Sequence, residues 1–125
     1  MARSLEDVLR STSDVLFPGD DEERVVALDS RSSEGDTPLH VMAWRKDVEG
    51  AGLLTAAGAD VNAIGDMDQT PLHVAIMQDD TQMIELLIKS GADTSLRSEF
   101  GKTALEEAVK KGGQIQNLVQ NRVRT

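Results

Sequence analysis

Hydrophobic residues are grouped along the chain in short blocks that alternate with polar, glycine-containing segments. Two of these blocks, at residues 39–43 and 72–76, have apolar side chains spaced three and four positions apart. This spacing indicates a helix that buries one face. The polar pairs Lys46-Asp47 and Asp79-Asp80 end the two blocks. The pattern therefore predicts short amphipathic helices.

A second helix is predicted after each of these blocks. Residues 83–88 are almost all apolar, and Gly91 follows them, where a left-handed residue commonly ends a helix. The corresponding earlier segment lies before Gly58 but contains Gly50 and Gly52. Because a glycine inside a helix costs about 1 kcal/mol relative to alanine, we expect this earlier helix to be the least stable of the array.

The helix starts and ends recur at a fixed interval. Thr37-Pro38-Leu39-His40-Val41 returns as Thr70-Pro71-Leu72-His73-Val74, and Gly58-Ala59-Asp60 returns as Gly91-Ala92-Asp93, both 33 positions later. A weaker start, Thr103-Ala104-Leu105, follows after another 33 positions. Threonine is a good N-cap residue and proline suits the first helical position. The sequence therefore predicts an array of units of about 33 residues.

Residues 1–33 lack these landmarks but have helix signals of their own. Ser4-Leu5-Glu6-Asp7 is a capping-box-like start for an apolar segment that reaches Leu16, and Pro18-Gly19 ends that segment. The stretch 24–29 is short and rich in β-branched residues, which predicts extended chain. We interpret residues 1–33 as a degenerate N-terminal cap, because a lone repeat cannot bury its own apolar face.

These landmarks resemble the ankyrin-repeat family. Its motif includes a Thr-Pro-Leu-His helix start, a Leu-Leu pair in the second helix and a closing Gly-Ala-Asp-Val-Asn, which the chain supplies at residues 70–73, 86–87 and 58–62. The resemblance implies an all-α solenoid of stacked antiparallel helix pairs with extended, β-hairpin-like links. Its repeats would be residues 34–66 and 67–99, followed by a C-terminal capping repeat at 100–125, in a single domain.

The chain departs from the family pattern between the two helices of each unit. The glycine expected there is Lys46 in the first unit and Asp79 in the second, and appears only as Gly112 in the third. The resemblance also implies a structural role for the only two histidines, His40 and His73, which would form hydrogen bonds at the helix starts and to the neighbouring repeat.

Composition and charge limit the possible partners. Aromatic residues make up only 2% of the chain, which suits a linear stack whose layers are filled by aliphatic side chains. The net charge of −9 is uneven, because residues 1–80 carry 17 acidic and 6 basic side chains. This balance argues against nucleic-acid binding, which needs clustered Lys and Arg. The run Asp20-Asp21-Glu22-Glu23 is interpreted as a solvated loop, with a docking patch for a basic partner as the alternative.

The sequence contains no recognisable site for chemistry. It has no cysteine, and hence no disulfide, thiolate zinc site or cysteine nucleophile. Residues 60–71 partly match a calcium loop, but Ile64 and Pro71 stand at ligand positions. No nucleotide-binding or nucleophile motif is found. We therefore predict no catalytic residue, metal or cofactor, and no enzymatic activity. Lacking a signal peptide or membrane-span pattern, the chain is expected to be cytoplasmic, and its two predicted caps favour a monomer.

Function is therefore expected to come from the exposed surface of the stack. The 33-residue offset aligns Glu34, Met67 and Phe100; Asp36, Gln69 and Lys102; Trp44, Met77 and Lys110; and Arg45, Gln78 and Lys111. In ankyrin proteins, partners usually contact these link tips and first-helix positions. Exposed Trp and Met are also common at interaction hot spots and adaptable surfaces.

We predict that five of these residues anchor a protein partner and that three acidic ones steer a basic surface toward it. The anchors are Trp44, Arg45, Met67, Met77 and Phe100, the steering residues are Glu34, Asp36 and Asp66, and Gln69, Gln78 and Lys102 complete the predicted contact set. The alternative is that Trp44 packs over the N-terminal cap and Phe100 covers the end of the array.

The leading functional hypothesis is thus a stand-alone protein-interaction module. Small ankyrin proteins of similar size are encoded in bacterial genomes, and some accompany secreted toxins as candidate immunity proteins. An acidic inhibitor that masks a basic toxin is therefore an alternative. A further alternative is a purely structural piece of a longer array, against which the weakened third unit argues, because a cut array would expose an intact apolar face.

Overall fold

The computed structural model describes residues 3–19 and 25–123, with the side chains of the last three helical residues left out. The acidic run at residues 20–23 and Arg24 lie outside the described residues. Within the described ranges, regular structure is helical apart from one bridge between Arg97 and Thr103. The helices are α1 (Leu5–Ser11), α2 (Ser13–Leu16), α3 (Pro38–Arg45), α4 (Val48–Ala56), the 3₁₀-helix η1 (Asp66–Asp68), α5 (Pro71–Met77), α6 (Thr81–Lys89), α7 (Ala104–Lys111) and α8 (Gly113–Val123).

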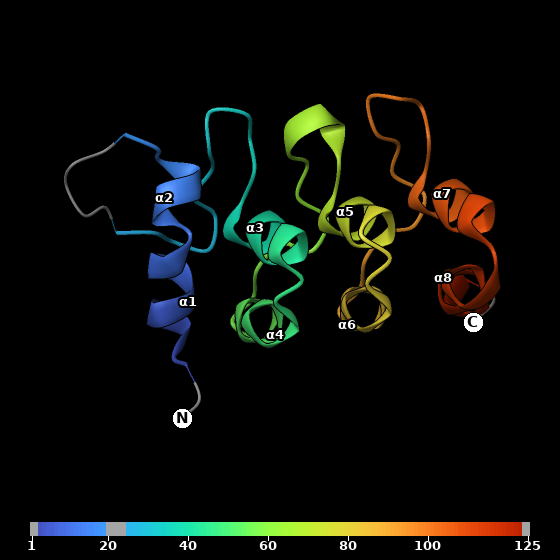
Figure 1. Cartoon of the computed structure of the whole chain (residues 1–125), viewed down its shortest axis with the longest axis horizontal. Coiled ribbons are helices and arrows are strands. Elements are labelled where there is room, and N and C mark those ends of the chain that lie inside the picture. Colours follow the sequence, from blue (N-terminus) through green and yellow to red (C-terminus); the bar gives the residue numbers. More distant parts are fainter. Residues whose placement is uncertain (1–2, 20–24, 124–125) are drawn as a thin grey trace.

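Three helix pairs stand side by side, and we refer to α3–α4, α5–α6 and α7–α8 as the first, second and third repeats. Figure 1 shows α3, α5 and α7 in one row and α4, α6 and α8 in a second row below it. Each helix packs against its partner in the pair and against its counterpart in the next repeat. This arrangement confirms the all-α solenoid of stacked helix pairs that the sequence predicts.

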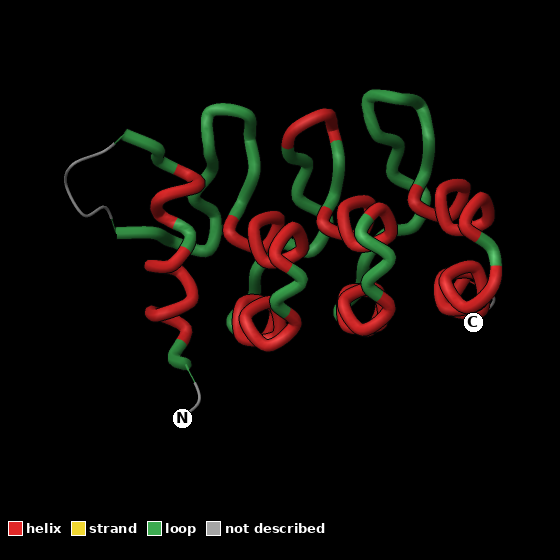
Figure 2. Tube along the Cα trace, viewed as in Figure 1, coloured by secondary structure: helices red, strands yellow, loops and turns green. Residues whose placement is uncertain are grey.

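Three projecting hairpins precede α3, α5 and α7, and Figure 2 shows them above the upper row of helices, in green except for the red 3₁₀-helix η1 at the tip of the middle one. Each tip is closed by one backbone hydrogen bond in the same register. The N–H of Ser32 donates to the carbonyl of Asp36 (2.8 Å), Gly65 to Gln69 (2.9 Å) and Ser98 to Lys102 (2.9 Å). We call residues 32–36, 65–69 and 98–102 the first, second and third link tips.

The predicted helix starts and ends are confirmed. The side chains of Thr37, Thr70 and Thr103 each accept a hydrogen bond from a backbone N–H three residues later. Gly58 and Gly91 follow α4 and α6 with φ angles of 102° and 98°, which L-residues rarely adopt. Behind each glycine, the next N–H reaches back to a carbonyl of the last helical turn, the Schellman arrangement that satisfies an otherwise unpaired acceptor.

The core is aliphatic and runs the length of the stack. Its fully buried members include Leu54, Leu72, Ile84 and Leu87, with Val119 closing it at the third repeat. Gly50 in α4 has a packing role that the sequence pattern did not reveal, because a Cβ at this position would overlap the sulfur of Met42 in α3. The glycine therefore allows the two helices of the first repeat to approach closely.

The N-terminal segment packs on the first repeat. Ser4 and Asp7 form the predicted capping box of α1, and α1 contacts α4. The guanidinium of Arg3 donates to both carboxylate oxygens of Asp47 (2.7 and 2.6 Å), and this interaction holds the pKa of Asp47 below its ordinary value. Because Asp47 is also the N-cap of α4, this ion pair joins the segment to the start of that helix.

Candidate functional site

The two histidines lie at equivalent positions and join one repeat to the next. His40 Nδ1 accepts from the Thr37 N–H (3.1 Å), so its Nε2–H donates to the carbonyl of Gln69 in the second link tip (2.8 Å). His73 repeats this arrangement, with Nδ1 accepting from the Thr70 N–H (3.2 Å) and Nε2 donating to the Lys102 carbonyl (3.1 Å). Both nitrogens of each ring are therefore used in hydrogen bonds, and each ring attaches the following link tip to the helix start of its own repeat.

Burial lowers the pKa of both imidazoles below the ordinary histidine value, because the interior disfavours the charged form. The carbonyl acceptors at Gln69 and Lys102 raise the two pKa values in the opposite direction, but burial is the larger effect. The neutral rings match the tautomer that the hydrogen bonds require. This geometry agrees with the structural role that the family resemblance implies for His40 and His73.

Four large apolar side chains of the predicted contact set are exposed on the link tips and first helices. Trp44 and Met67 are each 39% exposed, Met77 is 45% exposed and Phe100 is 65% exposed. Trp44 and Met77 lie near the ends of α3 and α5, whereas Met67 and Phe100 lie at link tips. These residues leave apolar area open to solvent, in contrast to the buried aliphatic residues of the same helices.

The acidic residues of the predicted contact set also contribute to the fold. One carboxylate oxygen of Asp36 accepts from the backbone N–H of Asp66 (2.9 Å), which joins the first and second link tips. Glu34 is exposed at the first tip, whereas Asp36 and Asp66 are half-buried. Asp36 is therefore a positioning residue for the second tip as well as an acidic group at the surface.

The remaining predicted contact residues differ in accessibility. Arg45 donates to the carbonyl of Ser11 (3.1 Å) and pairs with Asp14 (3.5 Å), so its guanidinium is directed to the N-terminal segment. Gln69 is nearly buried, Gln78 is half-buried and Lys102 is exposed. Gln69 is therefore withdrawn from the surface, whereas Arg45 remains exposed although its guanidinium bonds the N-terminal segment.

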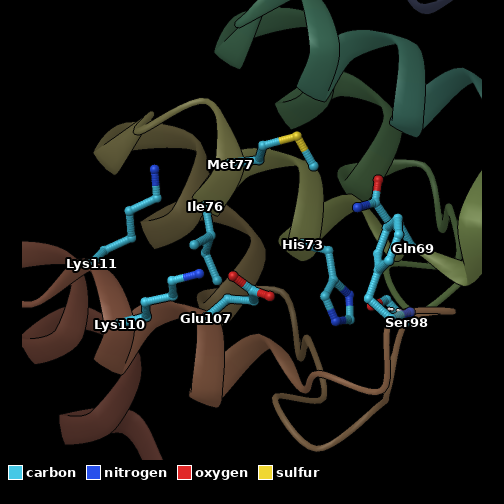
Figure 3. A pocket seen from close by; sticks show the side chains of 9 residues that line it. Gln69, His73, Ile76, Met77, Ser98, Glu107, Lys110 and Lys111 are labelled. Carbon is cyan, nitrogen blue, oxygen red and sulfur yellow. Dashed lines mark hydrogen bonds between the residues drawn. The ribbon is translucent and has the colours of Figure 1, made fainter.

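A cavity of about 420 Å³ lies where the second and third repeats meet. Figure 3 shows side chains of α5, α7 and the adjoining link segments around it. Three predicted contact residues, Gln69, Met77 and Phe100, are brought together here, whereas Trp44 and Met67 do not line it. The other lining residues are His73, Ile76, Ser98, Glu107, Lys110 and Lys111.

The predicted contact set omitted most of these lining residues. Lys110 and Lys111 lie on the aligned rows of first-helix positions, so the 33-residue offset was sufficient to find them. Glu107 has no such signal, because it stands in the register of Val41 and Val74, which are both buried. That register favours an apolar residue and gives no indication of a carboxylate beside His73.

The fold and surface define a class of protein, a helix-pair repeat solenoid with projecting link tips. A comparison with protein families matches residues 39–122 to ankyrin repeats in three copies. The chain therefore belongs to the ankyrin-repeat family, as the sequence landmarks indicated. Proteins of this family are generally non-enzymatic modules for protein–protein interaction. A comparison with curated proteins gave no match.

The part of the chain that the structure describes shows neither a metal cluster nor a membrane-spanning helix. No cluster of three or more His, Asp or Glu side chains with metal-binding geometry occurs there. None of its helices combines the length and the apolar character of a bilayer span.

Proposed function

We propose that this chain binds a protein partner through its tip-side surface, which consists of the three link tips and the ends of α3, α5 and α7. The observation that carries the proposal is the exposure of Trp44, Met67, Met77 and Phe100 on these elements. Large side chains of this kind supply much of the binding energy at protein interfaces when a partner removes them from water. Their position supports binding at the link tips and first helices.

Charge supports a partner with a basic surface over the first and second repeats. The first two link tips carry Glu34, Asp36, Asp66 and Asp68, and residues 1–80 as a whole are strongly acidic. Opposite charge on a partner accelerates encounter and fixes orientation more than it increases final affinity. We therefore expect the association rate to fall as salt concentration rises, since salt screens exposed charges.

The proposal is tested by capturing the partner from the native host and then measuring its affinity for variants. Trp44→Ala and Phe100→Ala are each expected to weaken binding by about tenfold or more, as interface hot spots do. Val25→Ala is the matched control, because Val25 is 95% exposed but belongs to neither the link tips nor the first helices. Circular dichroism verifies the fold of each variant. Unchanged affinity in both test variants would overturn the proposal.

A further inference from the structure

The cavity between the second and third repeats combines apolar and charged side chains in its lining. Resting on the proposed function, we infer that it receives a large apolar side chain of the partner together with a neighbouring carboxylate. The partner is thus expected to present an apolar residue next to Asp or Glu at this end of the stack, and basic residues toward the first two link tips.

The apolar part of the cavity is formed by residues from two repeats. Ile76 is buried in α5 and Met77 is exposed beside it, while Phe100 projects from the third link tip. A cavity of about 420 Å³ is large enough for one bulky side chain, and pockets of this kind are commonly apolar with a few polar groups that fix orientation. The high exposure of Phe100 and Met77 favours a side chain presented by a macromolecule over an enclosed small molecule.

The charged part of the cavity is on α7. Lys110 and Lys111 both line it, and Figure 3 shows the two lysines on the side of the cavity opposite Gln69 and Ser98. Lys111 pairs with Asp79 across the repeats (3.0 Å). Within the described residues Lys110 makes no ion pair, so its ammonium is the group available to a carboxylate of the partner.

Glu107 also lines the cavity, so the charge preference depends on a balance. The lining carries Lys110, Lys111 and Glu107, and Lys111 is already paired with Asp79, so Lys110 is the cation that remains for a partner, whereas the first two link tips are acidic. Glu107 is only half-exposed and lies beside His73, whose pKa it raises slightly against the larger effect of burial. The tip-side surface is therefore acidic over the first two tips and close to neutral at the cavity, where Lys110 supplies the ammonium that is not in an ion pair among the described residues. A complementary partner carries basic residues over the tips and one carboxylate at the cavity.

A library of random dodecapeptides displayed on phage provides a defined probe. Selection on the full chain is expected to enrich peptides in which a large apolar residue lies within two positions of Asp or Glu. Synthetic copies of an enriched peptide should bind Lys110→Glu about five- to tenfold more weakly, since one close charge pair is replaced by a repulsive one. Lys89→Glu makes the same charge change on α6, where Lys89 pairs with Glu85, and should leave binding unchanged.

Exchanging the charges of the peptide and the chain distinguishes loss of this contact from misfolding of the Lys110→Glu variant. A peptide whose acidic residue is replaced by Lys should bind the wild-type chain weakly and regain affinity for Lys110→Glu. The inference is overturned if no apolar–acidic peptides are enriched, or if Lys110→Glu leaves their binding unchanged. Binding that Trp44→Ala weakens but Lys110→Glu does not would overturn this inference while supporting the proposed function. If neither Trp44→Ala nor Lys110→Glu weakens binding, the result contradicts both this inference and the proposed function.

Discussion

The two junctions between neighbouring repeats use the same register but are packed differently. At the first junction, between the first and second repeats, the link tip begins at Gly65. At the second junction, the equivalent residue 33 positions later is Ser98. The junctions also differ at the residue that ends the preceding tip, which is Asp36 at the first junction and Gln69 at the second.

At the first junction the second tip is held closely. A Cβ at Gly65 would overlap the Asp36 carboxylate and the His40 ring, so this approach requires glycine. Asp36 also bonds the Asp66 N–H, and His40 Nε2 lies 2.8 Å from the Gln69 carbonyl. The junction therefore combines a buried imidazole with a close backbone contact.

At the second junction the contact between the tips is different, because the Glu99 N–H donates to the backbone carbonyl of Met67 (2.9 Å) rather than to a carboxylate. Ser98 has a side chain where Gly65 has none, and its hydroxyl accepts from the Phe100 N–H (3.3 Å). His73 Nε2 lies 3.1 Å from the Lys102 carbonyl, and this junction contains the cavity. The second junction thus holds its tip by hydrogen bonds, as the first does, and offers space to a partner beside His73.

The largest expected effect comes from filling the close contact at the first junction. Gly65→Ala should lower the free energy of unfolding by about 2–3 kcal/mol, because the new methyl group forces Asp36 and His40 apart. Ser98→Ala is the matched variant at the second junction and should cost less than about 1 kcal/mol. Urea unfolding measures both, and equal losses would contradict the contrast between the junctions.

The next effect concerns the turn that carries α7 into α8. Gly112 has φ 70° and ψ −170°, a region open essentially to glycine alone. Gly112→Ala should therefore cost about 1–3 kcal/mol of stability. The loss should appear first in faster hydrogen exchange of α7 and α8 than of α3 and α4, because only the third repeat depends on this turn. Uniform exchange across all three repeats would contradict a local effect of this turn on the third repeat.

Lowering the pH should also distinguish the two junctions. Both histidines have folded-state pKa values below the ordinary one, so the unfolded chain binds protons first as pH falls. Their contribution to stability is therefore complete above about pH 6.5 and is lost progressively below it. Because His73 lines the cavity at the second junction and is slightly more exposed than His40 (3% against 0%), His73 should protonate at the higher pH of the two. NMR titration of the two ring C–H signals tests this order, and the reverse order would contradict it.

Much of the fold was predictable from the sequence because its determinants are local and periodic. Thr37, Pro38 and Gly58 act within one helix turn, and the 33-residue offset carries the same reasoning to the next repeat. The site was less predictable because its properties depend on contacts between repeats. The offset aligns Gly65 with Ser98 but does not show that His40 occupies the space a Cβ would need. The direction of Arg45 toward Ser11 and the carboxylate of Glu107 in the cavity likewise depend on three-dimensional packing.

The smallest expected effect concerns the turns between the paired helices, where the family pattern has glycine. Lys46 and Asp79 have φ angles of 58° and 55°, a left-handed conformation that costs an L-residue about 1–2 kcal/mol. Lys46→Gly should therefore stabilise the chain by about 0.5–1 kcal/mol after the greater backbone entropy of glycine is subtracted. Asp79→Gly should give a smaller gain, because aspartate tolerates this conformation better and its pair with Lys111 across the second junction is lost. Thermal unfolding of both variants compares the two gains. A larger gain from Asp79→Gly would show that the Lys111 pair does not strengthen the second junction.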